Sequence, residues 1–379
     1  MDNLKIQSFG PIKDVDIDFG DLTFFVGPQA SGKSISLEVF KLLLDKDSIL
    51  TILEDYGYVL DNDSVRILNA YFGDGMDKLW KKDKTKISID RKRLTLTDLK
   101  KKGEGKESTV LYVPAQRVIC MEGGYPKNFK DFDAGTPFVI REFSEVIRSF
   151  MQYGISDKKV FPFKENSKNV QTESLDDSIF HHGKVKLSDV LGRKKLTLDI
   201  DGLTIPFMAW SAGQKEFMPL LLAFYCLAVA PSKLLRKEKF SIVIIEEPEM
   251  GLHPKAIESV LLQILELIRQ GYKVIVSTHS TLFLEFAWAF NTIKDNEGNV
   301  IEGIVNLFES KDKESLRKTI EKIKDKIVKT YFFKRTSRDK IVTKDISSLD
   351  VMSEEVDLSE WGGIMDFSTR SNEVVSRFS

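Results

Sequence analysis

The sequence has few cysteines and few histidines. Two Cys and four His occur in 379 residues, and the histidines, at positions 181, 182, 253 and 279, lack the Cys/His spacing of a zinc site. Cys120 and Cys226 lie in apolar stretches, which indicates buried free thiols instead of a disulfide framework. The sequence also lacks a signal peptide and an apolar run of membrane-spanning length. We therefore expect a cytoplasmic protein with no membrane partner.

The net charge of -1 conceals two basic segments. Residues 78–106 hold twelve Lys/Arg and four Asp/Glu, and residues 311–344 hold thirteen and five, so each segment carries +8. Such runs are most often solvated surface, and the alternative is contact with nucleic acid or an acidic protein. Both interpretations stay open.

A phosphate-binding motif lies near the N-terminus. It fits the Walker A pattern G-x-x-x-x-G-K-[ST] without a mismatch. An apolar run at 22–26 precedes it and helical spacing continues from 35 to 44, so strand, loop and helix follow in the required order. The motif consists of Gly27, Pro28, Gln29, Ala30, Ser31, Gly32, Lys33 and Ser34. Its amides would bind ATP, Lys33 would reach the β- and γ-phosphates, and Ser34 would ligate Mg²⁺.

An acidic strand end supplies the second part of the predicted site. Residues 242–245 are branched and apolar, and Glu246 and Glu247 follow them, at the strand end where α/β sheets bind ligands. Glu246 would hold Mg²⁺ through water, and Glu247 would polarise the attacking water. His279 follows the next predicted strand, 272–277, and we expect it to contact the γ-phosphate or its hydrolytic water.

A capped helix is predicted to begin at the segment Ser211, Ala212, Gly213 and Gln214. Ser211 is a good N-cap, and Gly213 permits close approach of backbone. A helix N-terminus presents free amides to an anion. Alone this pattern is weak; its position between the Walker A loop and the acidic strand makes it specific.

Taken together, these motifs resemble the ABC-type ATPase heads of the SMC/RecF/OLD-like superfamily. Residues 4–12 and 15–19 are similar to the family's opening strands, and the string at 246–254 is typical of bacterial ATPases related to OLD and to antiviral defence systems. The resemblance implies that Gln116 senses Mg²⁺ and the γ-phosphate, with Arg117 as the alternative. It also implies that residues 211–214 complete the nucleotide site of a second subunit, hence a homodimer or higher oligomer.

The chain departs from the family pattern in three ways. Ala212 stands where the signature often has Gly, and Gln29 where many relatives have Asn. The gap from Arg117 to Ser211 has room only for a compact insertion, not for the long coiled coil of an SMC protein.

The expected fold is α/β: a P-loop ABC-type head with a mostly parallel core sheet, an N-terminal antiparallel β subdomain and a helical and β insertion. We expect an N-terminal lobe at 1–120, an insertion at 121–204, a C-terminal lobe at 205–310 and a basic helical segment with a docking tail at 311–379. Within these, the pattern predicts a helix at 138–153, a loop at 164–177, a hairpin from 184 to 202 and a charged helix at 313–329.

The resemblance implies an ATPase that uses ATP and Mg²⁺ to switch an oligomeric assembly. One hypothesis is the sensor subunit of an antiphage system, of PARIS or Septu type, that controls a separate effector nuclease. Only 100 residues follow His279, fewer than the Toprim domain of OLD nucleases needs. The alternatives are a RecF-like DNA-repair ATPase and an ATP-binding scaffold with little turnover.

Overall fold

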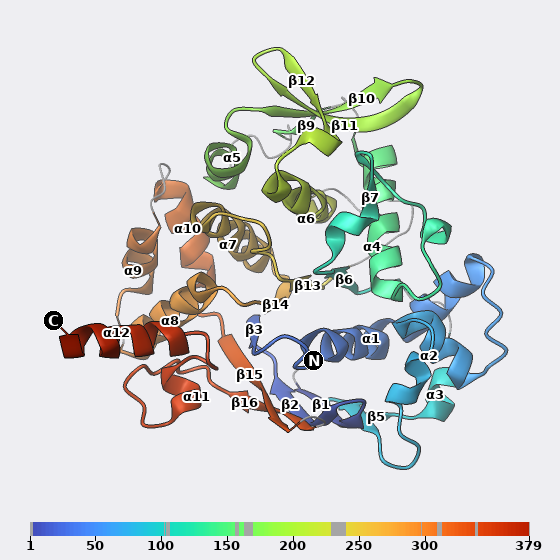
Figure 1. The fold of residues 1–379 in the computed structure, drawn as a ribbon, viewed down its shortest axis with the longest axis horizontal. Helices are drawn as coiled ribbons and strands as arrows, with labels where there is room; N and C mark the ends of the chain where they lie inside the picture. Colours follow the sequence, from blue (N-terminus) through green and yellow to red (C-terminus); the bar gives the residue numbers. More distant parts are fainter. Residues whose placement is uncertain are drawn as a thin grey trace.

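The computed structural model describes residues 3–101, 103, 107–155, 159–162, 170–228, 240–296, 298–308, 313–337 and 340–378. A large sheet runs through the molecule, and a smaller sheet lies at the top of the view in Figure 1. No described helix is long and apolar enough to cross a membrane.

The large sheet has ten strands in the order β5-β4-β1-β2-β16-β15-β3-β14-β13-β6. From β15 to β6 all neighbours are parallel, whereas β1 pairs antiparallel with β2 and β4. The predicted fold class is therefore confirmed, and the parallel core and the N-terminal antiparallel strands form one continuous sheet. Its strands are β1 (Asn3–Phe9), β2 (Ile12–Asp18), β3 (Leu22–Val26), β4 (Lys86–Ile89), β5 (Lys92–Leu94), β6 (Val110–Val113), β13 (Ile242–Glu246), β14 (Lys273–Ser277), β15 (Val328–Ser337) and β16 (Lys340–Asp345).

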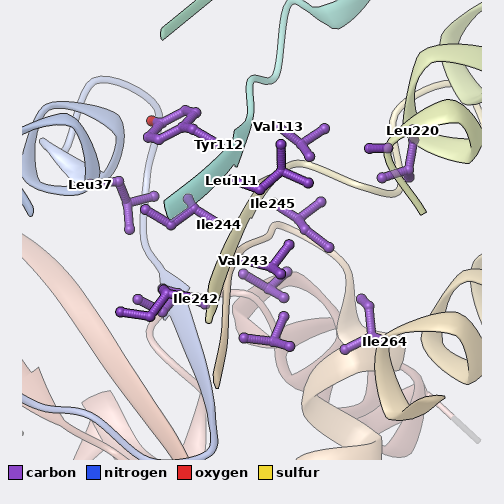
Figure 2. Close-up of a cluster of buried hydrophobic side chains, with 14 of the residues drawn as sticks. Leu37, Leu111, Tyr112, Val113, Leu220, Ile242, Val243, Ile244, Ile245 and Ile264 are labelled. Carbon is purple, nitrogen blue, oxygen red and sulfur yellow. The ribbon is translucent and has the colours of Figure 1, made fainter. Parts of the chain in front are cut away.

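Helices cover both faces of the parallel half. Every residue of β3 and β13 is buried, as expected for central parallel strands. Figure 2 shows Leu37 on one side of β6 and β13, and Leu220 and Ile264 on the other. These residues belong to three long helices, α1 (Lys33–Asp55), α6 (Ala212–Ala228) and α7 (Pro254–Arg269).

A buried ion cluster fixes the middle of α1. The helix is kinked at Asp45, whose carboxylate accepts hydrogen bonds from Lys41 (3.0 Å) and from the amide of Thr109 (2.9 Å). Lys41 also pairs at 2.9 Å with Glu142 of α4 (Phe138–Ser149). Because an uncompensated buried charge is costly, this cluster joins the P-loop helix firmly to its neighbours.

The C-terminal segment corrects one prediction. The charged helix predicted to reach residue 329 ends earlier, as α10 (Lys313–Ile323), and β15 and β16 then enter the sheet between β2 and β3. Residues 328–333 are β-branched or aromatic at five of six positions, which favours a strand over a helix. Further on, Trp361 is buried and its indole N–H donates to Leu349 O at 2.8 Å.

The smaller sheet lies in the segment predicted as an insertion, except that β12 continues past the predicted end at residue 204. Its order is β12-β11-β10-β9, and the predicted hairpin is confirmed by the antiparallel pairing of β10 with β11. The predicted helix at 138–153 is confirmed as α4 and a following π-turn, Phe150–Gly154. The strands are β9 (Lys159–Phe161), β10 (Lys184–Val190), β11 (Arg193–Ile200) and β12 (Leu203–Pro206), and a two-stranded sheet pairs β7 (Met121–Glu122) with β8 (Tyr125–Pro126).

The loop predicted at 164–177 is only partly described. Positions 164–169 lie outside the described residues, and the loop prediction is wrong for the rest, because Val170–Leu175 form α5 and Asp176–Phe180 form a π-helix. The remaining helices are α2 (Ser64–Phe72), α3 (Leu96–Lys100), α8 (Thr281–Asp295), α9 (Val300–Leu307), α11 (Val356–Ser359) and α12 (Asp366–Phe378). The division into four segments stays a prediction.

Both cysteines are buried and neither forms a disulfide, as the sequence indicated. Burial raises the pKa of the Cys120 thiol to about 12, so this thiol stays protonated at neutral pH.

Candidate functional site

The Walker A loop forms a tight arch between β3 and α1. Gly27 and Gly32 have φ of 141° and 84°, values that favour glycine. A Cβ at Gly27 would lie 2.6 Å from the carbonyl oxygen of Phe333 in β15, so the strand that sequence reasoning missed closes one side of the loop. Pro28 and Ala30 are exposed, which leaves the outer rim accessible to a ligand.

Lys33 turns back onto its own loop. Its Nζ donates to Gly27 O at 2.7 Å and to Pro28 O at 3.0 Å. Burial lowers the pKa of Lys33 to about 8, against the opposing effect of the nearby Glu247 carboxylate. Phosphate oxygens would offer the ammonium stronger acceptors than these carbonyls.

The carboxylate of Glu246 is buried at the end of β13. The amide of Ala115 donates to its Oε2 at 3.4 Å, and its Oε1 lacks a hydrogen-bond partner among the described residues. Burial raises the pKa of the Glu246 carboxyl, while the hydroxyl of Ser34 lowers it. A carboxylate oxygen with unused acceptor capacity beside a hydroxyl is an oxygen donor set that fits Mg²⁺.

This donor set is small for a metal. No group of three or more His, Cys, Asp or Glu side chains in the described ranges is placed to hold an ion. The fit is to a cation that takes its other ligands from phosphates and water, as nucleotide-bound Mg²⁺ does.

Glu247 and His279 lie together beside this pair. Glu247 has a φ of 43° and its amide donates to Ser277 O at 2.8 Å, so its side chain leaves the strand in a different direction from that of Glu246. His279 Nε2 is 3.6 Å from Glu247 Oε1. The His279 ring lowers the pKa of the Glu247 carboxyl, which therefore stays ionised at neutral pH.

Glu249 is a residue of this site that sequence reasoning missed. Its Oε1 accepts from the hydroxyl of Thr278 at 2.8 Å and from the amide of His279 at 2.6 Å. The carboxylate thus fixes the backbone that presents the imidazole. Its position two residues after Glu247, close to the strand end, was the signal in the sequence that could have identified it.

Arg117 and Gln116 differ sharply in environment. Arg117 is fully buried, and its guanidinium donates to the carbonyl oxygens of Glu216 (3.0 Å), Glu246 (3.1 Å) and Glu247 (3.2 Å). It therefore joins α6 to the end of β13. Gln116 is exposed, so its amide is accessible to a ligand.

The predicted N-cap at Ser211 is confirmed. The amide of Gln214 donates to Ser211 Oγ and the amide of Ser211 donates to Gln214 Oε1, both at 3.2 Å, which forms a capping box. Ser211 and Ala212 are exposed. α6 and α1 lie on opposite sides of β13 (Figures 1 and 2), and among the described residues no hydrogen bond or ion pair joins residues 211–214 to the chain's own Walker A loop.

Gly213 has a packing role in this chain. A Cβ there would lie 2.6 Å from the carbonyl oxygen of Gly251, in the turn after β13. The cap of α6 is therefore in close contact with the turn that carries Glu249.

Gly213→Ala is expected to destabilise the fold by about 1–3 kcal/mol, because the added methyl must displace backbone at Gly251. Equilibrium denaturant unfolding measures this change. Ala212→Gly, at an exposed neighbouring position, serves as the control and is expected to cost no more than about 1 kcal/mol. Equal stability of Gly213→Ala and the unsubstituted protein would contradict the close approach.

Two family models match the chain. Residues 1–153 match one described as "AAA ATPase domain", and residues 126–285 match one described as "AAA domain, putative AbiEii toxin, Type IV TA system". The first match contains the Walker A loop, Gln116 and Arg117, and the second contains residues 211–214, Glu246 and Glu247, and His279.

Among curated proteins, the Old nuclease of Escherichia phage P2 is 30% identical over 150 residues, which are 38% of this chain and 24% of that protein. The chain thus spans about a quarter of the length of this relative.

Among solved structures, an SMC head domain from Thermotoga maritima has a TM-score of 0.39 and 12% identity, over 91% of this chain and 98% of that one. An SMC head from Pyrococcus furiosus, with an extended coiled coil and bound to the C-terminal domain of ScpA, has a TM-score of 0.34 and 13% identity, over 75% and 90%.

Proposed function

From its similarity to the ABC-type ATPases of the SMC/RecF/OLD-like superfamily, we propose that this chain binds and hydrolyses ATP at a site that a second copy completes. The observation that carries the proposal is the gathering of Lys33, Ser34, Glu246, Glu247 and His279 at the ends of β3, β13 and β14, with the capped α6 on the other side of the sheet. Each half-site would then need its counterpart in another molecule.

In this proposal each residue of the cluster has a separate task. Lys33 exchanges its loop carbonyls for phosphate oxygens, and Glu247, ionised beside His279, accepts a proton from the attacking water. Ser34 and Glu246 would hold Mg²⁺, with Gln116 at its outer side, and the bound ion would neutralise charge on the β- and γ-phosphates. The exposed Ser211 and the amides behind it would contact the γ-phosphate held by the other copy.

Ser211→Arg tests the shared site. The added side chain should block the approach of the second copy, so ATP is expected to cause self-association of the unsubstituted protein and not of the variant, with ATP binding unchanged in both. Analytical ultracentrifugation with and without ATP measures this. The control is Asn296→Arg, an equal charge change at the exposed end of α8. Association of Ser211→Arg as in the unsubstituted protein would refute the shared site.

We further propose that the ATP-dependent assembly is a sensor in antiphage defence. It would control a separate toxic effector, and we propose that this effector is a nuclease. The name of the phage relative and the toxin description of the second family model support an ATPase of this kind. In the described part of the chain no group of three or more His, Cys, Asp or Glu side chains could hold the metal of a nuclease site, so we propose the nuclease as another protein. Co-purification of a nuclease from the native host tests this, and an assembly of this chain alone would count against it.

The RecF-like alternative is favoured by the two basic segments, 78–106 and 311–344. It would be supported if duplex DNA stimulated ATP hydrolysis and if this stimulation were lost when those lysines were replaced. A bound nucleotide with negligible turnover would instead indicate the scaffold.

A further inference from the structure

The tip of the β10–β11 hairpin projects beyond the rest of its sheet. β9 pairs with β10 only at Val185 and Lys186, and β12 pairs with β11 only from Thr197 onward. The three residue pairs nearest the turn, within 188–195, therefore pair with no third strand. Three such pairs, at about 3.4 Å per residue, give a free two-stranded ribbon about 10 Å long before the turn. Figure 1 places it at the top of the molecule, away from the large sheet.

The ribbon ends in an apolar residue held in an unfavourable conformation. Leu191 is 99% exposed with a φ of 54°, and Gly192 follows with a φ of 76°. Turns of this kind favour Asn or Asp before Gly, because a branched apolar side chain gains nothing from the left-handed region. Val190 beside it is also exposed. The turn geometry does not require an apolar residue at this position, and an exposed leucine lowers solubility, so neither explains its presence at the tip.

Three cations, Arg193, Lys194 and Lys195, follow this tip on β11. No ion pair joins them to a carboxylate within the described ranges. The acids of the hairpin are engaged: Asp189 accepts from the amide of Gly192 at 2.8 Å and Asp199 from Lys186 at 2.8 Å. The ribbon therefore combines an apolar end with positive charge on its β11 strand.

We propose that this ribbon, residues 188–195, enters the major groove of duplex DNA. Leu191 faces the base edges and the methyl groups of thymine, and Arg193 and Lys194 contact the phosphates that border the groove. The B-form major groove is about 12 Å wide and 8.5 Å deep and admits a two-stranded β-ribbon, which matches the projecting length. The deep, narrow major groove of A-form RNA does not.

The ribbon connects directly to the capped helix. β11 leads through β12 to Trp210, whose indole N–H donates to Ile205 O at 3.1 Å, and Ser211 comes next. Gln214 of the cap also donates to Ile179 O at 3.1 Å in the insertion. If the proposed function is correct, DNA on the ribbon lies on the same packed unit that contacts the second copy's nucleotide. The binding itself requires no nucleotide.

Binding is tested with the full chain, without ATP, by fluorescence anisotropy of a labelled 30-base-pair DNA duplex. Arg193→Glu with Lys194→Glu is expected to weaken binding at least about tenfold and to reduce the salt slope by about 2, since two phosphate contacts are lost. Leu191→Asn, which suits the turn, is expected to weaken binding about threefold to tenfold with an unchanged salt slope.

Lys13→Glu with Lys130→Glu, an equal charge change at two exposed positions outside the ribbon and outside both basic segments, is the control and should bind DNA as the unsubstituted protein does. Thermal unfolding checks that each variant is folded. The proposal is overturned if the unsubstituted protein does not bind the duplex, if Leu191→Asn binds it equally well, if the Lys13/Lys130 variant loses binding to the same extent as the Arg193/Lys194 variant, or if duplex RNA or polyglutamate competes as strongly as DNA. Because ATP is absent, none of these outcomes depends on the proposed ATPase cycle.

Discussion

Glu247→Gln is expected to lower the rate of ATP hydrolysis at least about 100-fold while leaving ATP binding intact, because the amide cannot accept a proton from the attacking water. The carboxylate it replaces is ionised beside His279 and is one-third exposed, so a water molecule can reach it. The ATP-bound assembly should then accumulate. Phosphate release and ultracentrifugation in the presence of ATP measure the two effects.

A matched control separates catalysis from a general loss of charge. Glu285→Gln makes the same chemical change at an exposed position of α8 and should leave hydrolysis unaltered. If Glu247→Gln hydrolyses ATP at the unaltered rate, the proposed role of Glu247 is wrong. If hydrolysis stops and no ATP-bound assembly accumulates, the catalytic role of Glu247 is supported, but the proposed ATP-dependent switching of the assembly is wrong.

Local patterns predicted the elements that surround the nucleotide. The strand at 22–26, the helix after Lys33 and the strand at 242–246 each combine a period, a length and a boundary residue in one short segment. The Walker A loop and the acidic pair also mark where two of the parallel strands end in the sequence. These features need no information from distant residues, and the structure has them within a few residues of the prediction.

Features that depend on distant partners could not be predicted in this way. β15 begins inside the stretch predicted as a charged helix to residue 329, and no element was predicted directly after it. The composition of 328–333 favours a strand, but the partner of that strand, β3, lies some 300 residues away in the sequence. The same holds for Arg335 of β15, which donates to Ala30 O of the Walker A loop. Pro219 lies inside α6 although proline disfavours a helix interior.

Arg117→Ala and Gln116→Ala are expected to separate the two residues that the sequence left as alternatives. Removing the buried guanidinium leaves the carbonyl oxygens of Glu216, Glu246 and Glu247 without their donor, and the free energy of unfolding should fall by about 3–5 kcal/mol. Denaturant unfolding measures this loss. Arg117→Lys should recover part of it, since an ammonium reaches fewer of the three carbonyls.

Gln116→Ala should behave in the opposite way. Its side chain is exposed, so stability should change by no more than about 0.5 kcal/mol. Loss of one hydrogen bond to the bound nucleotide should slow hydrolysis about tenfold, the rate equivalent of about 1.4 kcal/mol. If instead Arg117→Ala is as stable as the unsubstituted protein and only its hydrolysis fails, the guanidinium leaves its carbonyls on ATP binding, and Arg117 is the nucleotide sensor. The buried position of Arg117 argues for the first outcome, because three carbonyls of two elements converge on one side chain that the solvent does not reach.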